Sequence, residues 1–343
     1  MKILITGGGG FIGSRLASAL LARGQLGGTP IERIVLADQV APRADLTSDR
    51  RVEARVGALA GQCEALGKEG FDGIFHLASA VSGECEADFD LGLRSNIDTT
   101  RALLDALRAA TGRGRAPAKL VFSSSVAVFG PDPSVPLPPL VGDDTLTTPK
   151  TSYGTHKLVC EHLVADYSRK GFVDGRSARL MTVTVRPGRP NGAASSFFSG
   201  IVREPLAGVE AICPVSPEVS HPLTSAARTV EGLIAIYEAS VEQLGGRLAL
   251  NLPAVNATVA EMLAALEEVA GPEVRERVRF VRDETIAGIV ANWPKGSTAA
   301  RAARLGLRPD KSFADIIRQY IADCRAGPDA AQSLKGLAKE RHA

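Results

Sequence analysis

Tyr153 and Lys157 are the residues whose types and spacing first indicate chemistry. They stand four apart in the run "SYGTHK", inside a segment whose pattern predicts a helix from about 152 to 169. A four-residue spacing places both side chains on one face of a helix. A free tyrosine has a pKa of about 10, and a neighbouring ammonium favours the phenolate. The pair could therefore remove a hydroxyl proton while a hydride leaves the same carbon.

A run of three serines strengthens this interpretation. Alone, the pair is a weak signal, because an aromatic on a core face and a solvated lysine share its spacing. The run "LVFSSSVAVFG" ends a predicted strand about thirty residues before the tyrosine. Reactive groups of a doubly wound sheet gather at the carboxyl ends of its strands. A serine hydroxyl there could hold a substrate oxygen towards the tyrosine, and the alternative is a hydrated strand end.

A glycine-rich turn near the start of the chain indicates a dinucleotide. In "ITGGGGFIGSRLA", Gly8, Gly10 and Gly13 fit G-x-G-x-x-G, while Thr6 and Gly7 begin the overlapping pattern T-G-x-x-G-x-x-G. The turn follows a predicted strand and precedes a predicted helix. Backbone N–H groups and the positive helix end can then approach a pyrophosphate, which side chains would block.

Asp38 indicates which dinucleotide is bound. It ends the second predicted strand, near the distance at which a carboxylate holds a ribose 2′-hydroxyl. Its charge would repel a 2′-phosphate, so the predicted cofactor is NAD rather than NADP. Arg43 is the one nearby residue that opposes this prediction.

The elements that must position these residues alternate along the first half of the chain. The apolar runs are rich in Val, Ile and Leu without polar alternation, which is typical of parallel strands covered on both faces. The sequence therefore predicts an α/β fold with a doubly wound parallel sheet. The expected strands are 2–6, 33–38, 51–56, 71–79, 118–125 and 181–187, and the expected helices include 11–24, 88–110, 152–169, 224–243, 258–270 and 312–324.

Composition shifts suggest how the chain is divided. We expect residues 1–186 to form the nucleotide-binding domain, with about 222–245 returning to it. Residues 187–325 are expected to form a smaller α/β substrate-binding lobe, and 326–343 a mobile tail. The proline-rich residues 130–150 are a predicted surface loop and a candidate wall of the active site.

Composition also limits the classes of function. The 343 residues carry a net charge of +2, which leaves no basic field for nucleic acid or an anionic membrane. No stretch approaches the roughly 18 apolar residues of a membrane span. Five scattered cysteines without a C-x-x-C pair indicate a reducing compartment, so we expect a cytoplasmic protein. No metal-ligand spacing surrounds His156 and Cys160, so no metal is predicted. His76 is expected to be a core histidine.

The ordered set TGGGGFIG, LAD, HLAS, FSSSVAVFG, YGTHK and VRP resembles the extended short-chain dehydrogenase/reductase group. These are NAD-dependent sugar epimerases, dehydratases and dehydrogenases with a Rossmann sheet, and the resemblance covers about residues 1–325. It implies that Tyr153 is the catalytic base, Lys157 its partner and a ribose ligand, and Ser125 the substrate-orienting hydroxyl. It also implies a homodimer that pairs the helices of Asn96 and Tyr153.

The same resemblance implies a set of cofactor contacts. The implied NAD-binding residues are Gly7, Gly10, Phe11, Ile12, Gly13, Asp38, Leu59, Leu77, Ala78, Ser79, Asn96, Tyr153, Lys157 and Pro187. In this register Gly8 and Gly9 occupy variable positions of the turn. Gly10→Ala or Gly13→Ala is then expected to impair NAD binding far more than Gly9→Ala. The chain departs from the group at Ala58, where an aspartate touching adenine is usual, and at Phe129, where a tyrosine is common.

A narrower resemblance concerns the substrate. The segments "HLASAVSGECEADFDLGLRSN", "YSRKGFVDGRSARL" and "VRPGRPNGAASSFFSGIVREPLAG" resemble the D-erythronate dehydrogenase branch, which oxidises the 2-hydroxyl of a four-carbon sugar acid. The Y-G-P run of nucleotide-sugar enzymes is missing after the predicted strand 181–187. The implied substrate-binding residues are Ser82, Ser125, Arg189 and Asn191.

Arg189 could pair with a carboxylate, and its alternative is a loop arginine facing water. Arg228 is a second candidate, because the branch has an S-P-R run where this chain has Ser225-Ala226-Ala227 and then Arg228. Two other functions stay open. One is a nucleotide-sugar epimerase or dehydratase that keeps its NAD, and the other is a cofactor-binding regulatory protein without catalysis.

Overall fold

The molecule, a computed structural model that describes residues 1–188 and 194–337, is built around a seven-stranded parallel sheet. The strands lie in the order β12-β8-β7-β6-β1-β4-β5. They are β1 (Lys2–Thr6), β4 (Arg33–Asp38), β5 (Val52–Val56), β6 (Gly73–His76), β7 (Lys119–Ser125), β8 (Asp174–Leu180) and β12 (Leu250–Asn251). The chain runs from β1 outward to β5 and then returns past β1 to β6. Ligands of such sheets bind where the strand order reverses, here at the carboxyl ends of β1 and β6. The predicted doubly wound sheet is confirmed.

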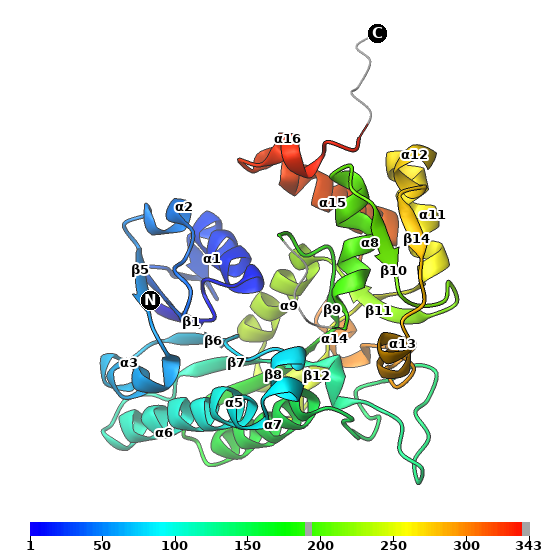
Figure 1. Ribbon diagram of the computed structural model, residues 1–343. Coiled ribbons are helices and arrows are strands. Elements are labelled where there is room, and N and C mark those ends of the chain that lie inside the picture. Colours follow the sequence, from blue (N-terminus) through cyan, green and yellow to red (C-terminus); the bar gives the residue numbers. More distant parts are fainter. Residues whose placement is uncertain (189–193, 338–343) are drawn as a thin grey trace.

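Helices cover both faces of this sheet (Figure 1). In β1, Ile3 and Ile5 pack on one face and Leu4 packs on the other, as the period of a strand requires. The first face is covered by α1 (Phe11–Arg23) and α9 (Ala226–Glu238), and the second by α3 (Cys63–Glu69), α6 (Thr99–Gly112) and α7 (Ser152–Arg169). Within the two described ranges, no helix combines the length and the apolar character that crossing a bilayer needs.

Short elements complete the sheet domain and carry several predicted site residues. They are β2 (Gln25–Leu26), β3 (Thr29–Pro30), α2 (Ala44–Thr47), η1 (Leu59–Gly61), α4 (Ser82–Ala87), α5 (Phe89–Gly92), η2 (Leu93–Asp98), η3 (Val126–Val128), α10 (Val241–Leu244) and α14 (Ala300–Arg304). The single long helix predicted over 88–110 is therefore wrong in detail. It is divided into α5, the π-helical η2 and α6.

A smaller lobe follows β8 and has its own apolar core around Phe198, Leu263 and Ile317. Its elements are β9 (Thr182–Val183), α8 (Ser196–Leu206), β10 (Ala211–Cys213), β11 (Ser220–Thr224), β13 (Val255–Thr258), α11 (Val259–Ala270), α12 (Pro272–Arg275), β14 (Val278–Phe280), α13 (Glu284–Val290), α15 (Phe313–Ala326) and α16 (Ala330–Ser333). Arg15 of α1 pairs with Asp323 of α15 at 2.7 Å and joins the two lobes.

The predicted strand 181–187 is wrong, and its replacement changes the layout of the site. The sheet strand is β8, seven residues earlier, while only Thr182 and Val183 are extended, in a separate three-stranded sheet. The sequence of β8, "DGRSARL", does not look like a buried strand because it contains Arg176 and Arg179. Both arginines are buried, and each has polar partners: Arg176 donates to the carbonyls of residues 236 and 237, and Arg179 binds a carboxylate.

Two further segments differ from their predictions. β12 extends the sheet beside β8, and its two residues lie just beyond the segment of about 222–245 that was expected to return to the nucleotide-binding domain. In the predicted tail, α16 forms, and Leu334 and Leu337 pack against the core of the smaller lobe. Residues 338–343 lie outside the described residues.

Candidate active site

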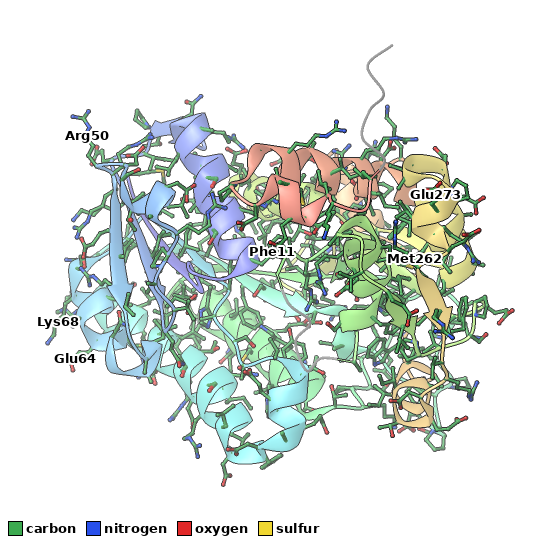
Figure 2. The ribbon with its side chains drawn as sticks, turned by 45° about the horizontal axis from the view of Figure 1, so that its top comes forward. Phe11, Arg50, Glu64, Lys68, Met262 and Glu273 are labelled. Carbon is green, nitrogen blue, oxygen red and sulfur yellow. The ribbon has the colours of Figure 1, made fainter. Side chains whose placement is uncertain are left out.

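The turn between β1 and α1 has an exposed helix N-terminus. Gly10 is the N-cap of α1, no side chain caps the helix, and its first turn contains no acidic residue. The N–H groups that open a helix have no intrahelical acceptor, so they can bind an anion. Phe11, the first residue of α1, lies at the end of the helix that faces the smaller lobe (Figure 2).

Gly7 and Gly13 are required by close backbone contacts. Gly7 has a φ of 74°, and a Cβ there would lie 2.8 Å from the backbone nitrogen of Ala78 at the end of β6. A Cβ on Gly13 would lie 2.0 Å from the carbonyl oxygen of Gly7. Both glycines therefore allow the turn to fold tightly against the strand ends.

Gly9 differs from its expected role, whereas Gly10 has more room for a side chain. A Cβ on Gly9 would lie 2.4 Å from the carbonyl oxygen of Val40, so this position does not accept a side chain freely. A Cβ on Gly10 would meet one atom, the Gly7 oxygen, at 3.2 Å. The prediction that Gly9 occupies a variable position is wrong for this chain, because the loop after β4 packs on Gly9.

Asp38 closes the same loop from the end of β4. Its carboxylate accepts hydrogen bonds from the N–H of Gly9 at 2.9 Å and from the N–H of Val40 at 3.1 Å. The side chain thus has a set orientation beside the glycine turn, where the ribose was predicted to bind. Arg43, the residue that opposed the NAD prediction, is ion-paired with Asp45. Its charge is therefore already balanced.

The end of β6 is held by Thr6 and Asn96. The Thr6 side chain accepts from the N–H of Ala78 at 3.3 Å. Asn96, on the π-helical η2, is buried, and its Oδ1 accepts from the N–H of Ala80 at 2.7 Å and from the Ser79 hydroxyl at 3.0 Å. These bonds place the predicted cofactor-flanking residues next to Gly7. The Asn96 side chain therefore positions these residues through its hydrogen bonds. Its direct contact with NAD stays a prediction.

Lys157 lies near the Tyr153 ring, as their four-residue spacing predicted, and it contacts the serine run of β7. The Lys157 ammonium is buried, donates to the Ser123 carbonyl at 2.8 Å, and lies 5.5 Å from the centroid of the Tyr153 ring. The Ser125 hydroxyl accepts from the N–H of Ala127 at 3.1 Å, which orients it at the start of η3. The catalytic roles of Tyr153, Lys157 and Ser125 stay predictions.

Gly154 brings this tyrosine against the serine strand. A Cβ on Gly154 would lie 2.1 Å from the carbonyl oxygen of Ala127, so the first turn of α7 packs directly on η3. Thr151 caps the same turn by accepting from the N–H of Gly154 at 3.0 Å. The glycine that follows Tyr153 is therefore part of the geometry of the site.

His76 is a core histidine, as expected. One ring nitrogen lies 2.7 Å from the Thr6 hydroxyl and the other 2.9 Å from the Thr100 hydroxyl. Burial, reinforced by the charge of Lys157, lowers the pKa of His76 to about 3. The ring is therefore neutral at physiological pH and adds no second charge beside the lysine.

A buried ion pair supports the site and was not anticipated. Glu161 on α7 binds Arg179 on β8 through both carboxylate oxygens, at 2.9 and 2.8 Å. The Ser124 hydroxyl donates to the same carboxylate at 2.5 Å. One feature of the sequence could have pointed to Glu161: it lies four residues after Lys157, on the same face of the helix. The pair joins α7 to the two strands that carry the site.

The remaining predicted residues are less closely gathered. Leu59 is only 6% exposed and packs within the sheet core, so most of its side chain is unavailable to adenine. Ser82 is the first residue of α4, and Pro187 is exposed, seven residues beyond the end of β8. Arg189 and Asn191 lie outside the described residues. Contacts of these five residues with ligands stay predictions.

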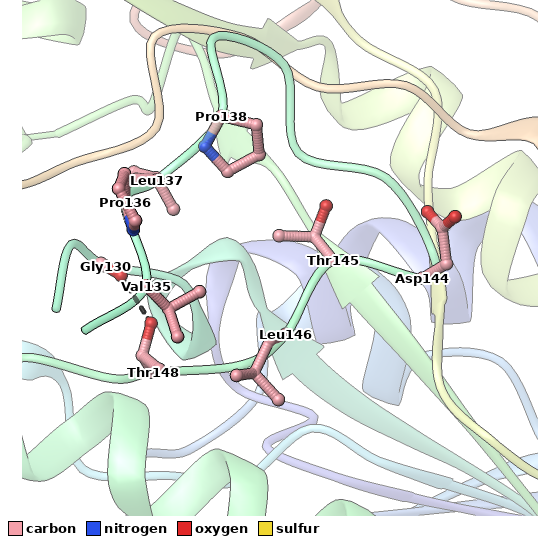
Figure 3. Close-up of a pocket in the computed structure, with 9 residues that line it drawn as sticks. All are labelled: Gly130, Val135, Pro136, Leu137, Pro138, Asp144, Thr145, Leu146 and Thr148. Atoms are coloured by element: carbon pink, nitrogen blue, oxygen red, sulfur yellow. Dashed lines mark hydrogen bonds between the residues drawn. The ribbon is translucent and has the colours of Figure 1, made fainter.

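The proline-rich loop folds around a cavity of its own. This cavity, of about 350 Å³, is lined by Gly130, Val135, Pro136, Leu137, Pro138, Asp144, Thr145, Leu146 and Thr148 (Figure 3). The Thr148 hydroxyl donates to the Gly130 carbonyl at 2.5 Å and closes the base of the loop. None of the predicted catalytic or cofactor-binding residues lines this cavity, so it is separate from the candidate active site.

Substitutions in the glycine turn distinguish the glycine that leaves room for NAD from the glycines that the backbone packing requires. Gly10→Ala is expected to keep the fold and weaken NAD binding, because its methyl group faces open space where the pyrophosphate would approach. Gly9→Ala and Gly13→Ala are expected to lower the free energy of unfolding as well, by about 1–3 kcal/mol, because backbone atoms must move. Calorimetric titration with NAD and thermal unfolding measure both effects. A Gly9→Ala protein with unchanged stability would contradict the packing argument.

The buried ion pair makes a second prediction. Glu161→Ala leaves the Arg179 guanidinium buried without its carboxylate, which is expected to cost about 3–5 kcal/mol of unfolding free energy. The matched control is Glu64→Ala, which removes the partner of Lys68 on the exposed face of α3 (Figure 2) and is expected to change stability little. Urea unfolding compares the two. Equal losses in both variants would refute the role of the buried pair.

Comparison with known proteins agrees with this arrangement. The chain is 47% identical over 331 residues to a D-erythronate dehydrogenase of Cupriavidus necator, covering 94% of this chain and 98% of the relative. It is 42% identical to a D-erythronate dehydrogenase of Haemophilus influenzae, covering 94% and 99%. A solved structure named as a nucleoside-diphosphate-sugar epimerase from Agrobacterium tumefaciens superposes with a TM-score of 0.90, at 44% identity and 95% coverage of each chain. A family model for the NAD dependent epimerase/dehydratase family matches residues 3–240, and the chain belongs to that family.

Proposed function

We propose that the protein is an NAD-dependent dehydrogenase that oxidises the 2-hydroxyl of a small sugar acid, D-erythronate or a close relative, to a 2-oxo acid. The observation that carries the proposal is the buried Lys157 ammonium beside the Tyr153 ring at the end of β7. The two relatives named D-erythronate dehydrogenase, matched over 94% of this chain, support the substrate class.

The residues present fit NAD. The exposed N-terminus of α1 suits the pyrophosphate, and the oriented Asp38 carboxylate suits an unphosphorylated ribose. When bound, NAD supplies the hydride acceptor. Tyr153 then removes the proton of the 2-hydroxyl, and the Ser125 hydroxyl holds the substrate oxygen. Lys157, fixed by the Ser123 carbonyl, stabilises the negative charge that the tyrosine oxygen carries before it takes that proton.

A nucleotide-sugar epimerase is the second candidate. It is favoured by the name of the Agrobacterium tumefaciens structure, which is 44% identical to this chain. Such an enzyme would keep NAD through purification and show no net change in absorbance of the cofactor. A thermal shift with UDP-sugars and none with aldonates would favour it over the dehydrogenase.

We also propose a cytoplasmic homodimer with a substrate-binding smaller lobe. The helices that carry Asn96 and Tyr153 would pair, and Phe89 and Val159 expose apolar surface along them. Five free cysteines agree with a reducing compartment. Sedimentation at working concentration is expected to give twice the chain mass, and a monomer at all concentrations would exclude the pairing.

The activity itself can be measured by the absorbance of reduced NAD. The wild-type protein is expected to produce NADH from D-erythronate and NAD. Tyr153→Phe is expected to lower kcat by about 10²–10⁴-fold while keeping NAD binding, because the general base is lost and the ring remains. No NADH with erythronate, threonate or other sugar acids of four to six carbons would refute the proposed function.

A further inference from the structure

Arg186, six residues beyond the end of β8, is held in one orientation by its surroundings. Its side-chain Nε donates to the carbonyl of Val183 at 3.3 Å. Its backbone N–H donates to the Ser199 hydroxyl at 3.0 Å, and its carbonyl accepts from Arg203 at 2.7 Å. A guanidinium fixed at both backbone and Nε loses little freedom on binding a ligand through its two terminal nitrogens.

This guanidinium is partly buried and has no acidic partner in the part of the chain that the structure describes. The neighbouring Arg203 is ion-paired with Oε1 of Glu204 at 2.5 Å. The adjoining residues 189–193 contain no Asp or Glu. Burial lowers the pKa of Arg186, and the charge of Arg203 lowers it further. Both effects would be offset by a bound anion.

The position of Arg186 relates it to the candidate catalytic residues. β8 ends at Leu180, which is paired in register with Ser125 on β7. Val183, the residue that fixes the Arg186 side chain, follows three positions later. Arg186 also interacts electrostatically with Tyr153, although the two lie on different elements. The guanidinium therefore lies beyond the carboxyl end of β8, next to the strand end that carries Ser125.

We propose that Arg186 binds the carboxylate of the substrate and so selects 2-hydroxy acids. In such an acid the carboxylate carbon is bonded directly to the carbon that loses the hydride. The cation that holds the carboxylate must then lie at the same end of the sheet as the residue that takes the hydroxyl proton, and Arg186 follows the carboxyl end of β8, the strand paired with the Ser125 strand. The terminal nitrogens of an arginine can bind both carboxylate oxygens at once. This inference rests on the proposed function and adds to it the residue that recognises the acid.

Arg228, one candidate from the sequence, is less suited to this role. Its guanidinium is ion-paired with Glu231 on the same helix at 2.6 Å, so its charge is already balanced. Its N–H is used in the cap of α9 by Ser225. Arg186 instead combines a fixed geometry with an unbalanced charge near the tyrosine.

The test compares an acid with its neutral amide. NADH formation is measured for D-erythronate and D-erythronamide, which share every hydroxyl and differ in the charge that Arg186 would bind. Arg186→Gln is expected to lower kcat/KM for the acid by about 30- to 1000-fold, mainly through KM. The preference for acid over amide is expected to fall towards one. Arg282→Gln, at an exposed ion pair with Glu284, is the matched control and is expected to keep the preference.

The outcomes separate this inference from the proposed function. A wild-type protein inactive on every sugar acid refutes the function itself. An active wild type whose acid preference survives in Arg186→Gln, or collapses in Arg228→Gln instead, overturns the role of Arg186. NAD affinity is measured in each variant, and a loss confined to NAD binding also overturns it. If Arg186→Gln does not fold, Arg186→Lys supplies the test, because a retained cation without paired donors is expected to reduce the preference partially.

Discussion

The hydrogen bond between the Lys157 ammonium and the Ser123 carbonyl is the contact on which the rest of the site depends. It ties the face of α7 that carries Tyr153 to the carboxyl end of β7 and buries a positive charge near the Tyr153 ring. A buried ammonium is costly unless its donors are satisfied, so the strand end must supply acceptors. The packing around α7 and β7 holds the helix and the strand end in this contact.

Two features bring the helix and strand into that contact. Gly154 allows the first turn of α7 to lie directly on the Ala127 carbonyl, where any side chain would collide. Glu161 then holds Ser124 of β7 and Arg179 of β8 in one buried cluster, one turn below the lysine. The neutral ring of His76 completes the environment without a competing charge. A solvent-exposed ion pair could not position the helix and strands as precisely, because burial is what removes the alternative side-chain positions.

Much of the site was predictable because its residues are local in sequence. The four-residue spacing of Tyr153 and Lys157 depends on one helix, and the glycine turn depends on one strand-helix junction. The strand after α7 was not predictable. The segment "MTVTVRP" has the composition of a buried strand, whereas Arg176 and Arg179 conceal the real one, β8. Their burial is tolerated only because Asp174, Glu161 and main-chain carbonyls lie beside them in the folded chain.

By itself, then, the sequence determined the doubly wound sheet, the dinucleotide turn and the tyrosine-lysine pair, since periodicity and short spacings encode them. The tertiary structure decided that Gly9 has no room for a side chain, because the loop after β4 packs on it. It also decided that Arg186 follows the true end of β8, next to the strand end that carries Ser125, without an acidic partner in the described chain. The room at Gly9 and the charge balance of Arg186 both depend on which distant segments of the chain pack together. A local pattern of residues does not encode that packing, so it does not encode burial or charge balance either.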